Sequence, residues 1–374
     1  MAQPLVPEPA LIADKPTNSK ELICEALRNY EIPFVAAGRD KKRVEEAMRF
    51  VPGIETADYE VVGVAHDAGA LAELFTGTQV VCNTVGPFHH FGETVVEAAA
   101  KAGVHYLDTT GEILFMDRAR EKFSAAYAAK GKVLAPSTAY MYTPLEIAAH
   151  IVLETPGIDT LEAICSATGT PTYGSTQSIF TMFEAAETAF YLDNRKRVIW
   201  PKARGYEVNV PGLPITQLAL PWGGGTLPLY FERDARVRSC RQLTTFTNRA
   251  LFEQLIGMQQ MYEKDIKPLA AQERAVRIKA IGESIQPGMP PRENPLVHRC
   301  VEHVEGRGGN RSASCTIRSF MPYLLTGVVQ AATANFLIGG RQLAAGFVSA
   351  CQAVGHLEIL GQLQNFGLVE VTKA

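Results

Sequence analysis

The amino-acid sequence predicts an α/β fold: a Rossmann-type, doubly wound parallel sheet, followed by an α+β domain with a largely antiparallel sheet. Between Val80 and Glu112, two short apolar runs flank a helical run, which is the order of a βαβ unit. From Leu145 the composition changes, and residues 198–241 alternate apolar residues with many Pro and Gly. That second pattern is typical of antiparallel strands joined by turns.

Composition limits the kinds of partner. The chain has 374 residues, of which 47% are hydrophobic, so it can bury two cores. Its net charge of −3 and the lack of a basic stripe argue against nucleic acid. Seven scattered cysteines without a CxxC pair favour a reduced, cytoplasmic setting. The eight histidines show no metal-ligand spacing, so we expect no metal site.

No integral membrane segment is expected. Residues Met1–Pro9 have neither the basic start nor the apolar core of a signal peptide. The apolar run Pro322–Gly340 is interrupted by Gln330, Asn335 and several Gly, so it predicts a core helix rather than a span. Peripheral contact with a membrane stays open.

Polar residues follow both strands of the βαβ unit. Asn83–Phe88 comes directly after the first strand, and Asp108–Glu112 follows the second. Parallel strands end at the same edge of the sheet, where α/β proteins bind ligands. We therefore expect the two motifs to face one crevice.

At this separation, the motifs Asn83–Phe88 and Tyr106–Glu112 resemble those of the saccharopine dehydrogenase-like oxidoreductases, which include the trans-acting enoyl reductases. The resemblance implies a bound dinucleotide whose nicotinamide end lies near the first motif, with the second motif closing the crevice. The cofactor-binding residues that it implies in these motifs are Asn83, Thr84, Gly86, Pro87, Asp108 and Thr110.

The glycine fingerprint of such a domain is degenerate. Ala10–Ile12 is a candidate strand and Glu21–Tyr30 a clear helix, and the fingerprint glycines would fall between them on Ala13, Pro16 and Ser19. Pro16 has no amide hydrogen to give a diphosphate, whereas the Ser19 hydroxyl can donate a hydrogen bond. We predict a phosphate contact at Ser19, or a loop that does not bind phosphate.

The second strand ends in Ala37-Gly38-Arg39-Asp40, where Rossmann domains contact the adenosine ribose. Arg39, with Lys42 or Arg43 behind it, favours the 2′-phosphate of NADP over NAD. The alternative is a solvated helix start with a basic cluster.

A second motif is also altered. Relatives have a Pro-Gly-x-Gly-Phe-Asp-x-x-Pro turn at this point. This chain keeps the two prolines, as Pro136 and Pro144, and the aromatic residue, as Tyr140, but has Met141 at the position of the aspartate. Reduction of a double bond needs a proton donor. Our candidates are Tyr142, Tyr173 and His89, and packing at the edge of the cleft is the alternative role for each tyrosine.

The resemblance extends to the end of the chain and implies that the closing helices return to the Rossmann domain. We therefore predict a dinucleotide-binding domain over 1–144, a substrate and dimerisation domain over 145–322, and closing helices over 323–374. Within the second domain we expect a helix over Gln177–Tyr191.

Together these features favour an NADP-dependent oxidoreductase that reduces a C=C or C=O bond in an apolar or aromatic small molecule. The oligomeric state stays open, with a homodimer as the candidate. The alternative is a non-redox lyase, isomerase or cyclase that has lost ordinary dinucleotide binding, as the missing glycines and Met141 suggest. A binding protein without chemistry is the third hypothesis, and the retained polar residues of the two motifs argue against it.

Overall fold

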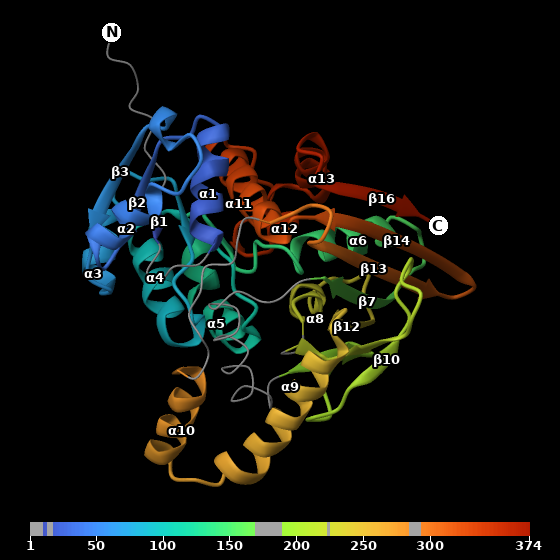
Figure 1. The fold of residues 1–374 in the computed structure, drawn as a ribbon. Helices are drawn as coiled ribbons and strands as arrows, with labels where there is room; N and C mark the ends of the chain where they lie inside the picture. The colour runs from blue at the N-terminus through green and yellow to red at the C-terminus, as the bar shows by residue number, and fades with distance from the viewer. Residues whose placement is uncertain (1–9, 13–17, 169–188, 223–224, 284–292) are drawn as a thin grey trace. The chain divides into compact units, whose positions relative to one another are not determined.

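The computed structural model describes residues 10–12, 18–168, 189–222, 225–283 and 293–374 (Figure 1). The chain forms two compact units, each built from separate stretches of sequence. The first unit comprises residues 1–110, 115–143 and 323–366. The second comprises residues 111–114, 144–322 and 367–374, so the final residues belong to it and not to the first unit.

The first unit contains a parallel sheet in the order β15-β6-β5-β4-β1-β2-β3. Its strands are β1 (Ala10–Ile12), β2 (Phe34–Gly38), β3 (Tyr59–Gly63), β4 (Val80–Asn83), β5 (His105–Asp108), β6 (Val133–Ala135) and β15 (Gly346–Phe347). The sheet grows from β1 to β3 on one side and from β4 to β6 on the other, which is the doubly wound order. The predicted Rossmann-type sheet is confirmed.

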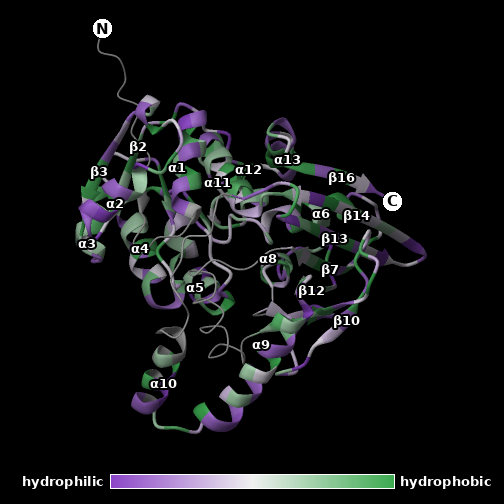
Figure 2. Cartoon of the chain, viewed as in Figure 1, coloured by the Kyte–Doolittle hydropathy of each residue, from purple (hydrophilic) through white to green (hydrophobic). Residues whose placement is uncertain are grey.

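Helices connect and cover these strands. They are α1 (Asn18–Asn29), α2 (Lys41–Met48), η1 (Ile54–Thr56), α3 (Ala68–Leu74), α4 (Phe88–Ala102), α5 (Ile113–Ala129), α11 (Pro322–Ile338), α12 (Ala350–Val354) and α13 (His356–Asn365). In Figure 2 the exposed α2 is largely hydrophilic, whereas α11, a buried helix, carries mostly hydrophobic residues. Helix α4 begins directly after Pro87, earlier than the Ala-rich run alone indicates, and ends at Gly103 in the left-handed conformation.

The C-terminal helices pack against α1 in the first unit. Near the α1 carboxyl end, the Tyr30 hydroxyl donates to Gln362 Oε1 of α13 at 2.9 Å. At the other end, Gly327 of α11 approaches the α1 backbone so closely that a Cβ there would lie 2.4 Å from the Leu22 carbonyl oxygen. The position therefore requires glycine for packing between helices.

We predict that Gly327→Ala destabilises the protein by about 1–3 kcal/mol, because the added methyl group forces α1 and α11 apart. The control is Gly361→Ala in α13, where a Cβ has no heavy atom within 4 Å. Alanine there should be neutral or stabilise by up to about 1 kcal/mol. Urea denaturation measures both, and equal effects would contradict the packing argument.

The second unit is built on a mixed sheet in the order β16-β14-β13-β7-β12-β8-β9. Its strands are β7 (Thr160–Ala167), β8 (Phe190–Asp193), β9 (Lys196–Ile199), β12 (Ser239–Phe246), β13 (Arg299–Gly308), β14 (Arg311–Phe320) and β16 (Val369–Lys373). Only the β7–β12 pair of this sheet is parallel among the described strands. The predicted α+β unit with a largely antiparallel sheet is confirmed.

The remaining elements of this unit are the hairpin β10 (Tyr206–Val208) and β11 (Gln217–Ala219), and the helices α6 (Thr143–Leu153), α8 (Leu227–Phe231), α9 (Arg249–Met261), η4 (Tyr262–Ile266) and α10 (Ala271–Glu283). The hairpin residues Val210 and Ala219 pack with Ile164 of β7 in a small core.

The predicted helix Gln177–Tyr191 is wrong at its carboxyl end, because Phe190–Asp193 is strand β8. Phe190 and Leu192 are buried, and the residues that alternate with them are partly exposed. That period of two belongs to a strand. Residues 177–188 lie outside the described part of the chain.

A buried carboxyl group lies in the middle of the second sheet. Glu302 of β13 is fully buried, and the Ser319 hydroxyl of β14 contacts both of its carboxyl oxygens at 3.0 Å. Burial raises the pKa of Glu302 from 4.5 to about 8, against the smaller effect of the Ser319 hydrogen bond. The side chain is therefore mostly protonated near neutral pH.

Because the pKa of Glu302 is higher in the folded state than in the unfolded state, its contribution to stability decreases as the pH rises from about 4.5 to about 8. We predict that wild type loses stability relative to Glu302→Gln over this window, by at most about 1.4 kcal/mol per pH unit. The same change at Glu305, exposed on the same strand, should have little effect. Urea denaturation at several pH values measures the difference, and parallel pH profiles for wild type and Glu302→Gln would refute it.

Candidate functional site

The two polar motifs lie side by side at the carboxyl edge of the first sheet. Asn83, the last residue of β4, pairs in register with Asp108, the last residue of β5. Both side chains are fully buried. The predicted placement of the motifs at one edge of the sheet is confirmed.

Tyr106 links the two motif residues. Asn83 Nδ2 donates to the Tyr106 hydroxyl at 2.9 Å, and that hydroxyl donates to Asp108 Oδ2 at 2.8 Å. Burial and the neighbouring Asp108 carboxylate raise the pKa of Tyr106 well above its usual value. The phenol thus remains a proton-bearing donor at any physiological pH, and the three side chains form one buried chain of hydrogen bonds.

The other oxygens of Asn83 and Asp108 hold the loops that follow the strands. Asn83 Oδ1 accepts from the Val85 amide at 2.9 Å, and Asp108 Oδ1 accepts from the Thr110 amide at 2.9 Å. Both are side-chain turns in which an Asx residue bonds the backbone two residues on. Asp108 Oδ1 also accepts from the Ser137 amide at 2.8 Å, so one carboxyl group joins the loops after β5 and β6. Both side chains are used for hydrogen bonds inside the protein. The carboxyl edge of the sheet therefore presents the backbone of the loops that these side chains position.

Helix α11 reinforces the same loops. Gln330 Nε2 donates to the carbonyl oxygens of Asp108 and Thr138, both at 2.8 Å. One turn earlier, Thr326 Oγ1 accepts from the Tyr140 amide at 3.1 Å. Sequence reasoning assigned no role to Tyr106 or Gln330. The signal available in the sequence was a polar residue within an apolar run. Tyr106 lies in such a run two positions before Asp108, and Gln330 lies in the middle of a core helix.

The remaining residues of the first motif lead into α4. Thr84 is buried, and Gly86 and Pro87 are partly exposed and joined by a cis peptide bond. Phe88 packs against Phe115 with ring centroids 5.9 Å apart, so it belongs to the core of the first unit. Thr110 of the second motif is also fully buried.

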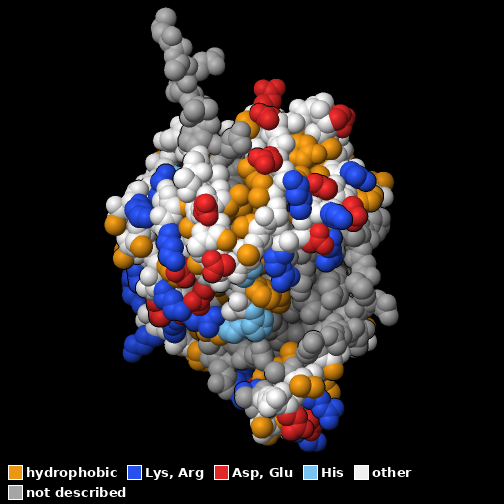
Figure 3. All heavy atoms as spheres, turned by 90° about the vertical axis from the view of Figure 1, so that its left-hand side faces the viewer, with side chains coloured by type: hydrophobic (Ala, Val, Ile, Leu, Met, Phe, Trp, Pro, Cys, Tyr) orange, Lys and Arg blue, Asp and Glu red, His pale blue; other side chains and the backbone are white. Residues whose placement is uncertain are grey.

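His89, a candidate proton donor, lies half-buried on α4 beside Arg118 of α5. Its Nδ1 is 3.2 Å from Arg118 Nη2, and Arg118 Nε pairs with Glu93 at 2.9 Å. Burial and then the Arg118 charge lower the pKa of His89. The ring is therefore neutral near pH 7 and carries its proton on Nε2 when Nδ1 accepts from Arg118. On the face drawn in Figure 3, histidine side chains are grouped next to lysine and arginine side chains.

The loop after β2 carries a basic group. Asp40 caps α2, because its Oδ1 accepts from the Lys42 amide at 3.0 Å and the Arg43 amide at 3.3 Å. Arg39 is exposed, as are Lys41, Lys42 and Arg43 at the start of α2. The only acidic side chain of this turn is thus committed to the helix cap.

The other predicted site residues are placed only in part. Strand β1 and helix α1 flank the degenerate fingerprint as expected. Ala13 and Pro16 lie outside the described residues, and so does the side chain of Ser19. Tyr142 is 8% exposed, next to the start of α6, and Tyr173 lies outside the described residues.

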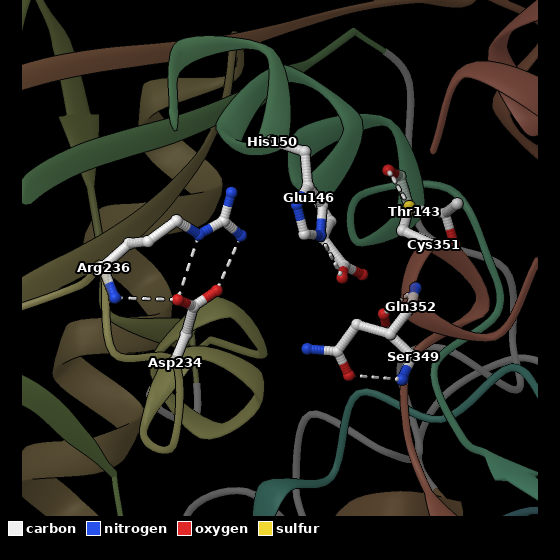
Figure 4. A network of polar contacts seen from close by, with 8 residues as sticks. All are labelled: Thr143, Glu146, His150, Asp234, Arg236, Ser349, Cys351 and Gln352. Carbon is white, nitrogen blue, oxygen red and sulfur yellow. Dashed lines mark hydrogen bonds and ion pairs between the residues drawn. The ribbon is translucent and has the colours of Figure 1, made fainter. Parts of the chain in front are cut away.

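Figure 4 shows further polar contacts that the sequence did not single out. In the second unit, His150 Nε2 and Glu146 Oε1 of α6 are 3.2 Å apart, and Arg236 pairs with Asp234 at 2.7 Å. In the first unit, Ser349 and Gln352 form the capping box of α12. Each is a contact between residues close in sequence, which makes a structural role sufficient to explain them.

Neither a metal-binding cluster nor a membrane-spanning helix occurs among the described residues. No three of their His, Cys, Asp and Glu side chains are grouped so that they could hold a metal ion. None of the described helices is both long and apolar enough to cross a membrane.

Comparison with known families accounts for both parts of the chain. Residues 143–372 match the model described as "Family of unknown function (DUF5938)", and residues 20–142 match the "Saccharopine dehydrogenase NADP binding domain". The chain belongs to the DUF5938 family. Its first part is a saccharopine dehydrogenase NADP binding domain, which confirms the resemblance carried by the two motifs.

Two curated relatives match this DUF5938 protein over about a third of its length. A trans-acting enoyl reductase of Mycobacterium ulcerans (strain Agy99) is 31% identical over 126 residues, 33% of this chain and 30% of the relative. A lipid droplet localized protein of Caenorhabditis elegans is 26% identical over 125 residues, 32% and 29% of the two chains. The matched part therefore spans less than a third of the length of either relative.

Among solved structures, apo saccharopine dehydrogenase (L-Glu forming) from Saccharomyces cerevisiae superposes with a TM-score of 0.63 at 12% identity. The alignment covers 98% of this chain and 100% of the yeast chain. At this identity, the similarity shows a shared fold.

We predict that Tyr106→Phe destabilises the protein by about 1–3 kcal/mol, because it leaves Asn83 Nδ2 and Asp108 Oδ2 buried without this partner. The control is Tyr127→Phe. Tyr127 is equally buried, but its hydroxyl makes one hydrogen bond, to the Val96 carbonyl at 3.0 Å. That change should cost about 1 kcal/mol. Chemical denaturation compares them, and a smaller loss for Tyr106→Phe would show that the hydrogen-bond chain is not important for stability.

Proposed function

We propose that this DUF5938 protein is an NADP-dependent oxidoreductase that reduces a C=C or C=O bond in an apolar or aromatic small molecule. The family match of residues 20–142 and the similarity to a trans-acting enoyl reductase of Mycobacterium ulcerans support a redox reaction with NADP. When bound, NADPH supplies the hydride. The residues of this chain bind and orient the two reactants and supply the proton.

The observation that carries the proposal is the use of Asp40. In an NAD-dependent Rossmann domain, an acidic residue after the second strand accepts from the ribose 2′-hydroxyl. Here the Asp40 carboxylate caps α2, and its neighbours in sequence, Arg39, Lys41, Lys42 and Arg43, are four exposed basic residues. Arginine and lysine at a helix amino terminus suit a 2′-phosphate, which supports NADP over NAD.

In this proposal the remaining cofactor contacts come from Ser19 and from the motif residues Asn83, Thr84, Gly86, Pro87, Asp108 and Thr110. Asn83 and Asp108 act by fixing loop backbones, because their side-chain oxygens accept from Val85 and Thr110 amides. Thr84 and Thr110 are buried beside them.

Tyr142 and Tyr173 are the preferred proton donors in this proposal. His89 fits the role less well, because burial and Arg118 lower its pKa and leave a neutral ring that hardly gives up its proton. A neutral imidazole suits donation of a hydrogen bond to a substrate oxygen instead.

A second candidate function is a non-redox lyase, isomerase or cyclase. It is favoured by the start of α1, where the fingerprint positions Ala13, Pro16 and Ser19 lack glycine and the family match begins only at residue 20. Glu21 lies in the first turn of α1, and burial raises its pKa to about 7 against the effect of Lys20. An ionised carboxylate in the first turn of a helix disfavours an anionic ligand at that end, and at a pKa of about 7 this group is partly ionised near neutral pH.

We also propose a cytoplasmic homodimer. All seven cysteines are free and buried, which supports a reducing compartment. A closed two-fold dimer is the commonest assembly of soluble enzymes. Light scattering of the purified protein measures its mass, and a monomer at micromolar concentration would exclude the dimer.

The first test is calorimetric titration with NADPH and NADH. We predict that NADPH binds more tightly than NADH, and that Arg39→Ala weakens NADPH binding by about tenfold or more through loss of a charged contact to the 2′-phosphate. The control is Arg49→Ala, at the opposite end of α2 and also exposed. It should leave the affinity unchanged. Failure of wild type to bind either nucleotide at millimolar concentration would exclude hydride transfer and leave the non-redox enzyme.

A further inference from the structure

Gln330 stands out because it is a fully buried amide in the middle of an apolar helix. Both hydrogens of its Nε2 are used, one on the Asp108 carbonyl and one on the Thr138 carbonyl, at 2.8 Å each. The partners are 222 and 192 residues away in sequence. The amide orientation is determined by this contact, since the reverse would point Oε1 at two carbonyl oxygens.

Oε1 of Gln330 has no hydrogen-bond partner within the described part of the chain. A buried acceptor without a donor is unfavourable, and leucine or methionine would fill the same volume without it. Packing of α11 therefore does not explain a glutamine here. The two donated hydrogen bonds do.

The two carbonyls belong to the last residue of β5 and to the loop after β6. The Thr138 amide donates to the same Asp108 carbonyl at 2.8 Å, so that oxygen receives two hydrogen bonds. Thr326, on the same face of α11 one turn earlier, accepts from the Tyr140 amide. Helix α11 thus fixes the backbone of both loops relative to each other.

We propose that Gln330 is a positioning residue that clamps the loops after β5 and β6 in the geometry that receives the nicotinamide half of NADPH. This rests on the proposed function. In a doubly wound sheet, the half containing β4 to β6 contacts the second nucleotide, and the half containing β1 to β3 contacts adenosine. Loss of the clamp should therefore weaken recognition of the nicotinamide end and spare the adenosine end.

The test compares Gln330→Met with Thr333→Val. Methionine has nearly the same volume and lacks the amide. Thr333 is also fully buried on α11, but its hydroxyl donates only to the Val329 carbonyl within the helix, at 2.8 Å. Two probes are titrated: NADPH, and adenosine 2′,5′-bisphosphate, which carries the 2′-phosphate without nicotinamide.

Gln330→Met is expected to weaken NADPH binding by about tenfold and to change the fluorescence emission of the bound reduced nicotinamide. Its affinity for adenosine 2′,5′-bisphosphate should stay within about twofold of wild type. In the protein without nucleotide, amide hydrogen exchange should rise over residues 108–112 and 136–142. Thr333→Val should match wild type in all three measurements.

If Gln330→Met weakens the binding of NADPH and of adenosine 2′,5′-bisphosphate equally, the variant has lost folding in general, and the positioning role is refuted. Unchanged NADPH binding with unchanged exchange in the two loops would overturn it as well. Wild type that binds neither probe would refute the NADP-dependent function, and with it the positioning role. If wild type binds NADPH and the Gln330→Met variant behaves like Thr333→Val, the positioning role of Gln330 is refuted and the proposed function is not.

Discussion

The edge of the first sheet depends on the buried carboxyl group of Asp108. Parallel strands leave backbone amides and carbonyls without partners where they end, and each such group costs about 1–3 kcal/mol when it is buried and unpaired. Asp108 accepts from two loop amides and from the Tyr106 hydroxyl, and its own carbonyl receives Gln330 and Thr138. One residue therefore connects β4, β5, β6 and α11. Its first role is to give two loops a fixed backbone.

Much of this arrangement follows from local pattern. The Rossmann-type sheet is predictable because its strands are short apolar runs separated by helical periods, and adjacency of Asn83 and Asp108 follows from the order of parallel strands. Gln330 was not predictable, because its partners lie 192 and 222 residues away. Strand β8 was missed because a helical pattern in the preceding residues was continued through an alternation only four residues long. Glu302 shows the same limit, since its burial comes from neighbouring strands of the sheet.

The two ends of the proposed dinucleotide site differ in how the sequence specifies them. At the adenosine end, Asp40 and the adjacent basic residues form a local cap-and-charge pattern that sequence alone reveals. At the diphosphate end, the usual glycines are missing, and α1 is held instead by packing, with Gly327 of α11 against its backbone. A helix placed in this way keeps its position without a glycine-rich turn before it. The family match to an NADP binding domain, which starts within α1, is compatible with this arrangement.

The interleaving of the two units has a consequence for synthesis of the chain on the ribosome. The first unit needs residues 323–366, which are made after the whole central segment of the second unit, and the second unit closes only with β16 at residues 369–373. Neither unit can complete its core before its last segment has been synthesised. The nascent Rossmann sheet must therefore wait, with the α11-facing side of α1 uncovered, until residues 323–366 have been made. Such a chain depends on protection of exposed apolar surface during that interval.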